Sequence, residues 1–409
     1  MAFIPFAQGA QQYLELVSSA VGEANGETCA DLLSATHPHT RNKKLQLENA
    51  EALCSRFLDS PWDELVAAHL RCCWATAQND ALTCYACQTT VVQIFNRILQ
   101  THKEDNWALP VMYVVIADLR TFANEADSVQ MSAGRGKPGE LLEKAADCIM
   151  SCFRVCVSDT RSTLDVSKKW GTLPIVNNLF KIYFKTNKLH LCKPLIRAIE
   201  SSNIKENFRR SHLVTYKYYV GRKAMFDNDY EKAEEYLSYA FEHCHPSSGR
   251  NQRLVLVYLI PIKMMSGCLP SSELLDRHNL QQFTGVAQAV ARGNLRLLND
   301  ALLEHEAFFI KFGIYLILEK LKIMIYRNLF KKVFLLMRVH QLPLTAFVVS
   351  MQMVGEDEMD VDEVQCIVAN LIDKNYIRGY ISHQHRKLVV SKQNAFPRLP
   401  STDLKMSLT

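Results

Sequence analysis

The periodicity of the apolar residues changes near residue 326, and no other feature limits the possible folds as strongly. Before this point, apolar side chains recur almost throughout at the spacing of helices. After it, the pattern predicts three short helices followed by two strands, which is the element order of a winged helix. The first helix is expected to leave Arg327 on the surface and to bury an apolar stripe made of Tyr326, Leu329, Phe330, Val333 and Leu336.

Turn and capping signals place the other elements of this unit. Pro343 is expected in the first turn of the second helix, where its missing N–H costs no hydrogen bond. The third helix is expected over about 360–375, with acidic residues at its amino end, where the helix dipole favours negative charge. From Tyr376 the period becomes two, so residues 377–381 and 388–390 are predicted to pair as a two-stranded wing around a polar turn.

The rest of the chain is predicted to consist of helical hairpins. Residues 213–246 have the small and aromatic residues of a tetratricopeptide repeat, in which Gly221, Ala233 and Ala240 would let two helices approach. Turn-like pairs separate further amphipathic segments at Asn79-Asp80, Asn187-Lys188, Asn228-Asp229 and Gly293-Asn294. We therefore predict a mostly α fold, a right-handed α-solenoid of degenerate TPR-like helical hairpins ending in a C-terminal winged helix.

These patterns divide the chain into three regions. Residues 1–205 are expected to form an N-terminal helical-repeat region. Residues 206–395 are expected to form a second domain, with TPR-like helices over 206–325 and the winged helix over 326–395. Residues 396–409 contain proline and serine and are expected to be a flexible tail.

Composition and the amino-terminal sequence favour an intracellular protein. The net charge is +5, from 47 basic and 42 acidic side chains, which is too mild to indicate nucleic-acid binding without a local cluster. The amino end lacks the pattern of a secretory signal, and no apolar stretch approaches the about 18–20 residues that span a membrane. The 13 cysteines are therefore expected to be reduced thiols.

Motifs for catalysis or metal binding are incomplete. Residues 134–139 match G-x-G-x-x-G, but helical sequence precedes them and Pro138 stiffens them, so we interpret them as a solvated loop. Cys84 and Cys87 lack a second pair of ligands and are expected to be buried in a helix, as are Cys148, Cys152 and Cys156. Three His-x-His pairs also lack a partner pair, at His37/His39, His243/His245 and His383/His385. We expect no enzyme activity, no cofactor and no bound metal.

Charge is distributed unevenly over the predicted winged helix. The amino end of the third helix carries Asp360, Asp362 and Glu363, which would repel phosphates, so this helix is not expected to enter a DNA groove. Basic residues lie at its far end, on the wing and on the first helix: Lys374, Arg378, His383, His385, Arg386, Lys387 and Lys392, with Lys331, Lys332 and Arg338. They are candidates for sequence-independent phosphate contact, with the acidic end left for a protein partner. The alternative is that they are solvated, or form the rim of a protein interface.

A second group of basic residues surrounds the predicted turn at Asn187. It consists of Lys181, Lys185, Lys188, Lys193 and Arg197. Such a group could bind an acidic peptide, or could only solvate the ends of helices, and the sequence favours neither reading.

A degenerate helical repeat that continues without a linker into a winged helix resembles the PCI domain, which would cover residues 206–395 here. Subunits of the proteasome lid, the signalosome and translation initiation factor three share this domain. Within the family, several stretches are similar to the members that act in nuclear mRNA export. These stretches are residues 106–120, 177–204, 215–226, 233–245 and 379–397, the last reading GYISHQHRKLVVSKQNAFP.

This resemblance implies a non-enzymatic adaptor that couples transcription to mRNA export. It implies a location in the nucleus, including the nuclear pore, with some of the protein in the cytoplasm. It also implies four kinds of partner, without insertion into a membrane: a large PCI-containing export scaffold, a small acidic disordered subunit shared with the proteasome lid, RNA or DNA, and components of the nuclear pore. The alternative function is a structural PCI subunit of a proteasome-lid, signalosome or translation-initiation assembly without nucleic-acid binding.

Overall fold

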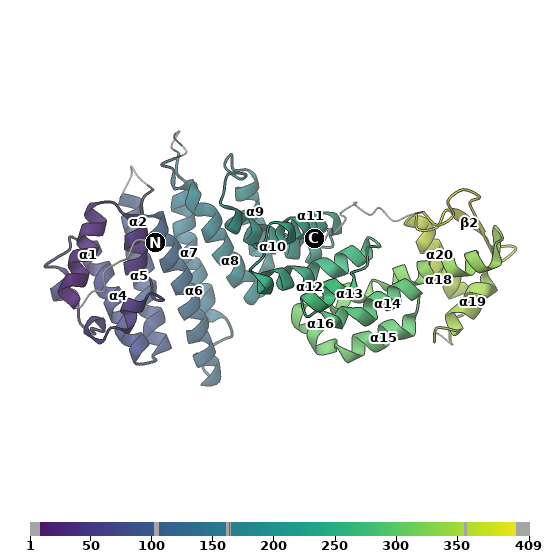
Figure 1. Ribbon diagram of the computed structural model, residues 1–409, viewed down its shortest axis with the longest axis horizontal. Helices are drawn as coiled ribbons and strands as arrows, with labels where there is room; N and C mark the ends of the chain where they lie inside the picture. The colour runs from purple at the N-terminus through teal and green to yellow at the C-terminus, as the bar shows by residue number, and fades with distance from the viewer. Residues whose placement is uncertain (1–8, 102–105, 161–162, 164, 356–357, 398–409) are drawn as a thin grey trace. The chain divides into compact units, whose positions relative to one another are not determined.

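The computed structural model describes residues 9–101, 106–160, 163, 165–355 and 358–397. The chain divides into two compact units, Met1–Tyr219 and Val220–Thr409. Both are built almost entirely of helices, as the periodicity predicted (Figure 1). Among the described residues, no helix is both long enough and apolar enough to cross a membrane.

The first unit is a row of helices that pack against their neighbours in the chain. Helices α5, α6, α7 and α8 lie side by side, and α4 packs on α5 (Figure 1). Short 3-10 turns connect several of the helices. The elements are α1 (Ala10–Gly22), α2 (Gly26–Leu32), η1 (Pro38–Arg41), η2 (Lys43–Leu45), α3 (Glu51–Cys54), α4 (Trp62–Ala77), α5 (Ala81–Thr101), α6 (Leu109–Ser132), α7 (Glu140–Val157), η3 (Lys168–Gly171), α8 (Thr172–Lys185), η4 (Leu189–Leu191) and α9 (Cys192–Glu200).

The second unit begins within α10 (Arg210–Phe226), which crosses the boundary between the two units. A Cβ atom on Gly221 would lie 2.7 Å from the Leu237 side chain, and Ala233 and Ala240 are fully buried, so the small residues do permit the close helix packing predicted for this repeat. The helices before the winged helix are α11 (Tyr230–Glu242), α12 (Gly249–Met265), α13 (Ser272–Arg277), η5 (Gln281–Phe283), α14 (Thr284–Arg292), α15 (Leu295–Glu304), α16 (Glu306–Phe312) and α17 (Tyr315–Glu319).

All four predicted turns are confirmed, and they share one backbone mechanism. The first residue of each pair has a positive φ, which asparagine and glycine tolerate better than other residues; the values are 57° at Asn79, 57° at Asn187, 63° at Asn228 and 64° at Gly293. In three of the pairs the second residue then caps the next helix through its side chain, which accepts from Thr83 N, Lys232 N or Leu297 N.

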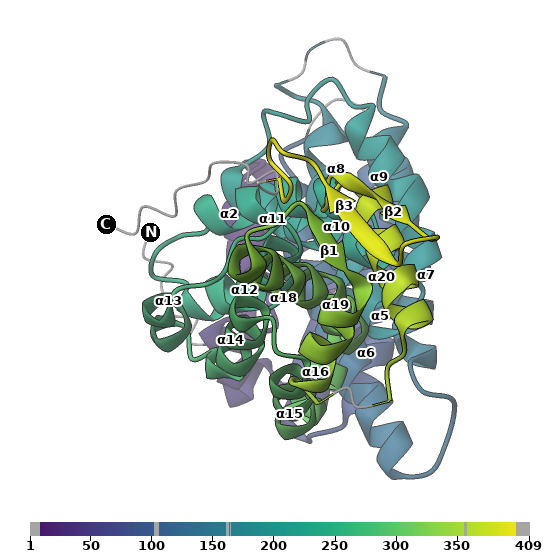
Figure 2. The same ribbon diagram turned by 90° about the vertical axis from the view of Figure 1, so that its right-hand side faces the viewer.

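Helices α18 (Lys322–Met337), α19 (Leu344–Gln352) and α20 (Val361–Asp373) with strands β2 (Gly379–Ser382) and β3 (Lys387–Val390) form the predicted winged helix. The sheet has one strand more than predicted. Strand β1 (Gln341–Pro343) pairs antiparallel with β3, giving the order β1-β3-β2 (Figure 2). Pro343 therefore ends this strand and is the N-cap of α19, one position before the predicted place in its first turn.

The core of the winged helix lies between its three helices and the sheet. Phe330 of α18 and Phe347 of α19 are fully buried, with ring centroids 4.6 Å apart. Val364, Val368 and Leu371 of α20 are also fully buried, as are Leu342 and Leu388 of the paired strands β1 and β3. The hydrophobic pattern thus located most of this core correctly.

Two residues of α18 depart from the prediction. Leu336, expected in the core, is 82% exposed, because the buried face of α18 ends at Val333. Arg327, expected on the surface, is 5% exposed and donates hydrogen bonds to Pro397 O and to Asn328 Oδ1. A buried guanidinium requires such acceptors, and a backbone carbonyl from a distant segment supplies one of them.

The segment after β3 returns to α18. Phe396 and Pro397 are buried, and the Phe396 ring lies 5.5 Å from that of Phe334 of α18, measured between centroids. The first two residues of the predicted tail therefore pack against the winged helix. The remainder of that tail, 398–409, lies outside the described residues.

A capping box begins α20. The side chain of Asp360 accepts from Glu363 N at 2.8 Å, and the side chain of Glu363 accepts from Asp360 N at 3.1 Å. Two backbone N–H groups at the start of the helix are satisfied in this way.

We expect Asp360→Ala to lower the free energy of unfolding of the winged helix by about 1 kcal/mol, because one of these N–H groups loses its acceptor. Asp360→Asn keeps an acceptor while removing the charge, and should restore most of the loss. Chemical denaturation monitored by hydrogen exchange of peptides from α20 measures both. Equal losses for the two variants would show that the charge, not the cap, carries the effect.

Candidate nucleic-acid interface

The wing is the hairpin of β2 and β3, and its shape depends on a close backbone approach. Gly379 pairs with Val390, and a Cβ atom at Gly379 would lie 2.2 Å from Val389 O. At the tip, Arg386 has a φ of 48°, and its carbonyl accepts from Leu344 N at the start of α19. The tip is therefore held against the body of the winged helix by backbone contacts.

The basic residues predicted for the wing do gather on it and at the carboxyl end of α20. Lys374, Arg378, His383, His385, Arg386 and Lys392 are exposed, whereas Lys387 is half-buried within β3. Within the described residues, none of these seven groups forms a salt bridge with a carboxylate. The Arg378 side chain donates to Asn375 Oδ1, and His383 contacts Gln365 of α20. The wing thus presents basic side chains that no carboxylate of the described residues neutralises.

The second basic group lies on the later part of α18 and just after it. Lys331, Lys332 and Arg338 are exposed. Lys332 Nζ donates to Arg292 O at 2.8 Å, which leaves two of its three protons for other acceptors. Arg338 ends α18 with a φ of 53°.

The acidic end of α20 is used partly for structure. Asp360 and Glu363 are engaged in the capping box, so Asp362 is the one of the three predicted partner-binding acids whose side chain has no hydrogen bond within the described part. Glu356 and Asp357 lie outside the described residues. A phosphate backbone would meet three carboxylates here, so the amino end of α20 is unsuited to reading a DNA groove.

Exposed apolar side chains on the winged helix were not predicted from the sequence. Leu335 and Leu336 of α18 are 57% and 82% exposed, and Met353, which follows α19, is 83% exposed. Val349 and Tyr380 are also more than half exposed. Single exposed apolar residues are common, and only a contiguous patch of them is typical of a surface that contacts another protein.

Most of the basic side chains near Asn187 are buried or already contact other groups of the protein. Lys188 forms a salt bridge with Glu143 at 2.7 Å, and Lys185 donates to Asn124 Oδ1. Lys181 is partly buried; desolvation lowers its pKa, with a further contribution from Arg120. Lys193 and Arg197 remain exposed and form no salt bridge within the described residues. A binding site for an acidic peptide would therefore start from these two side chains.

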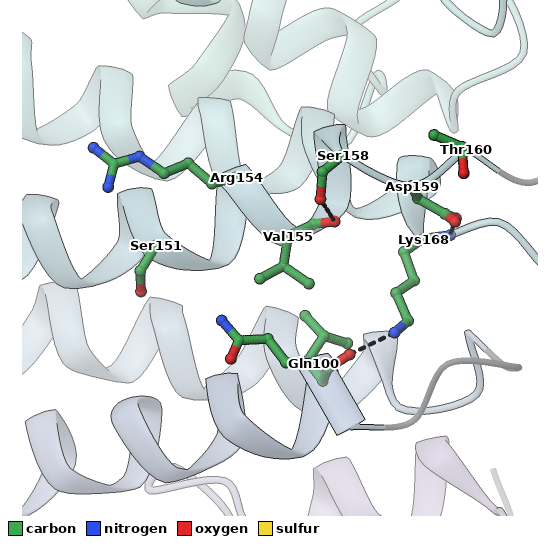
Figure 3. Close-up of a pocket in the computed structure, with 9 residues that line it drawn as sticks. Gln100, Ser151, Arg154, Val155, Ser158, Asp159, Thr160 and Lys168 are labelled. Atoms are coloured by element: carbon green, nitrogen blue, oxygen red, sulfur yellow. Dashed lines mark hydrogen bonds between the residues drawn. The ribbon is translucent and has the colours of Figure 1, made fainter.

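The first unit also contains an open cavity of about 860 Å³ between α5 and α7 (Figure 3). Arg154, Ser151, Gln100 and Lys168 are among its lining residues. The Lys168 ammonium donates to Leu99 O, and the Asp159 carboxylate accepts from Lys168 N and from the Ser167 hydroxyl. These groups are engaged with the protein, and they form no pairing of nucleophile and base among the residues described.

The glycine-containing motif at 134–139 and the cysteines at 84–87 and 148–156 lie where the sequence predicted them, in a loop and in helices. Residues 134–139 form an exposed loop between α6 and α7, without a preceding strand. Cys84 and Cys87 are buried in α5 and pack with Cys72 and Phe122. Cys152 and Cys156 are fully buried, and Cys148 is half-buried.

The family model and the related proteins that match this chain agree on one family. Residues 302–392 match the model of the PCI domain. PCI domain-containing protein 2 of Danio rerio is 58% identical over 390 residues, which cover 95% of this chain and 98% of that protein. The Drosophila melanogaster homologue of that protein is 46% identical over 94% of this chain and 97% of its own length. Protein CSN12 homolog of Mycosarcoma maydis is 30% identical over 85% of this chain and 86% of its own length.

Proposed function

The chain belongs to the family of PCI domain-containing protein 2, and from this membership we propose that it is a non-enzymatic adaptor subunit of a complex that couples transcription to mRNA export. The complex would act in the nucleus, including the nuclear pore, with some of the chain in the cytoplasm. In this proposal the winged helix binds RNA or DNA through the phosphate backbone, and other surfaces bind protein partners.

The observation that carries the nucleic-acid part is the set of exposed cations on the wing that have no carboxylate partner within the described residues. Each phosphate contact releases a condensed counterion, so such a set gives affinity without sequence preference. The acidic amino end of α20 limits how a nucleic acid can lie on the domain. We therefore place the backbone along the wing and the carboxyl end of α20.

Two protein partners complete the proposal. A large export scaffold with its own PCI domain would contact the winged helix, where Leu336 and Met353 offer apolar side chains. A small acidic disordered subunit would contact basic helix ends in the first unit, starting at Lys193 and Arg197. Charge complementarity supports the second contact, because long-range attraction speeds the capture of a disordered acidic chain.

The variant with Arg378, Arg386, Lys387 and Lys392 all changed to alanine should bind RNA roughly 100-fold more weakly near physiological salt, because up to four phosphate contacts are lost. The slope of log affinity against log salt should become shallower by about 0.7–0.9 for each contact that the wild type makes. Fluorescence anisotropy with labelled RNA and DNA, on the chain assembled with its scaffold, measures both quantities.

A matched variant removes four exposed cations from outside the winged helix, Lys44, Arg56, Arg250 and Lys311, and so changes the net charge equally. It should retain affinity and slope. If the wing variant kept the wild-type slope, the proposal of phosphate contact would be wrong. The chain would then be better described as a structural PCI subunit of a proteasome-lid, signalosome or translation-initiation assembly.

A further inference from the structure

Three potential metal ligands converge inside the first unit, far from the winged helix in the sequence. His39 comes from η1, and His69 and Cys73 lie one turn apart on the same face of α4. Their exposed fractions are 6%, 1% and 2%. Their ligand atoms, one per residue, all lie within 4.8 Å of one another.

The separations between these atoms are close to those around a tetrahedral zinc ion. His39 Nε2 lies 3.0 Å from His69 Nε2, and Cys73 Sγ lies 3.7 Å from His69 Nε2. Zn–N bonds of about 2.0–2.1 Å and a Zn–S bond of about 2.3 Å place tetrahedral ligand atoms about 3.3 and 3.6 Å apart. The two separations that involve His69 are within a few tenths of an ångström of these values, and the separation between the His39 and Cys73 ligand atoms is at most 4.8 Å.

A neighbouring histidine orients His39 for this role. His37 Nδ1 lies 3.0 Å from His39 Nδ1, so one hydrogen bond can fix the proton of His39 on Nδ1 and leave the Nε2 lone pair directed at His69. Tyr13 stacks on the His39 ring with centroids 5.4 Å apart, and its hydroxyl donates to Leu32 O. Both contacts restrict the orientation of the imidazole.

The ligand atoms of this cluster converge on one nitrogen of His69. Its Nε2 faces both His39 Nε2 and Cys73 Sγ, whereas its Nδ1 is buried and has no hydrogen-bond partner among the described residues. A cation enclosed by the three ligand atoms would bind the Nε2 lone pair and leave the proton of His69 on Nδ1.

We propose that His39, His69 and Cys73 bind one zinc ion inside the first unit, with His37 as a positioning residue. Two imidazoles and a thiolate are ligands that zinc prefers, and the fourth position would be filled by water, as in other zinc sites with three protein ligands. Binding forms the Zn–S bond as the Cys73 thiol releases its proton to solvent.

The protonation states of the ion-free cluster are compatible with this site. Desolvation, followed by the charges of His69 and His37, lowers the pKa of His39 to about 2, and desolvation lowers that of His69 to about 4. Both rings are therefore neutral at pH 7, which is the state that coordinates a metal. Burial raises the pKa of Cys73 to about 12, so the ion must displace the thiol proton.

The position of the cluster indicates what the ion would stabilise. Residues 33–50 connect α2 to α3 with only the short 3-10 turns η1 and η2. His39 is buried in this connection, whereas His69 and Cys73 belong to the long helix α4. A zinc ion would thus fix an irregular segment to a regular helix at the start of the helical repeat.

Zinc content is the direct test. The full chain, carrying a tag without histidines and purified without chelators, should contain about one zinc ion per chain by inductively coupled plasma mass spectrometry. His69→Gln and Cys73→Ser should lose it. His190→Gln and Cys148→Ser are matched controls from the same unit and should retain it. His37→Gln should weaken zinc binding by about 10–100-fold.

A second measurement does not depend on how well the variants fold. Wild-type protein stripped of metal should melt at a lower temperature and recover on addition of zinc chloride. Addition of cobalt chloride should produce a thiolate-to-cobalt charge-transfer band that Cys148→Ser preserves. A folded wild type that contains no zinc and gives no such band would overturn the proposal. Undiminished zinc in folded His69→Gln and Cys73→Ser would do the same.

Discussion

Replacing Phe347 with alanine is expected to lower the free energy of unfolding of the winged helix by about 3–5 kcal/mol. The ring is fully buried in α19 and packs against Phe330 of α18, with centroids 4.6 Å apart. Its removal loses the transfer free energy of a large apolar side chain and leaves a cavity between two of the three helices. Because the wing joins α19 through Arg386 O, RNA binding should fall with stability.

Hydrogen exchange of peptides from 326–392, measured across a denaturant series, would report this loss separately from the first unit. Val349→Ala is the matched control, because this side chain of the same helix is 54% exposed and should change stability by less than about 0.5 kcal/mol. Similar protection in the two variants would show that Phe347 does not anchor the winged-helix core.

Replacing Gly379 with alanine is expected to cost about 3 kcal/mol, because the close approach of β2 to β3 leaves no room for a methyl group. The added Cβ would lie 2.2 Å from Val389 O and 3.0 Å from Val390 Cα. Both obstacles are backbone atoms, so the strands must separate or shift register. The wing cations would then move relative to α20, and RNA affinity should fall although every charge remains.

Tyr380→Thr in the same strand is the control for Gly379→Ala. Tyr380 is 63% exposed, and threonine retains a high strand propensity, so stability should change by less than about 0.5 kcal/mol. Measuring stability and RNA affinity together separates the loss of folding stability from the displacement of the wing cations. If Gly379→Ala unfolds at the same denaturant concentration as the control, the close contact between the strands relaxes without cost.

Local sequence was sufficient to predict those elements that depend on a few neighbouring residues. The turns at Asn79, Asn187, Asn228 and Gly293 were predictable because a positive φ followed by a capping residue leaves a local signature. The three helices and the hairpin of the winged helix were predictable from hydrophobic period for the same reason. Strand β1 was missed because three residues carry no period, and they become a strand only by pairing with β3.

The sequence predicted which basic residues make up the candidate interface, but not which of them are paired with a carboxylate in the fold. Sequence identified the cations of the wing and those near Asn187 equally well. Tertiary structure distinguishes them, because Glu143 pairs with Lys188 while no carboxylate among the described residues pairs with the wing. Similarly, Arg327 and Leu336 exchanged their expected environments, since a helical period does not specify where the contacts of a helix end.

The element types, the winged helix and the resemblance to the PCI family follow from the sequence alone, because each is encoded in local patterns or in similarity along the chain. Which side chains meet depends on the tertiary structure. His39 and His69 lie 30 residues apart in the sequence, and nothing along the chain connects the His37/His39 pair with His69. Packing of η1 on α4 brings their nitrogens to 3.0 Å, because burial of the apolar residues around them fixes distances that spacing along the chain does not specify.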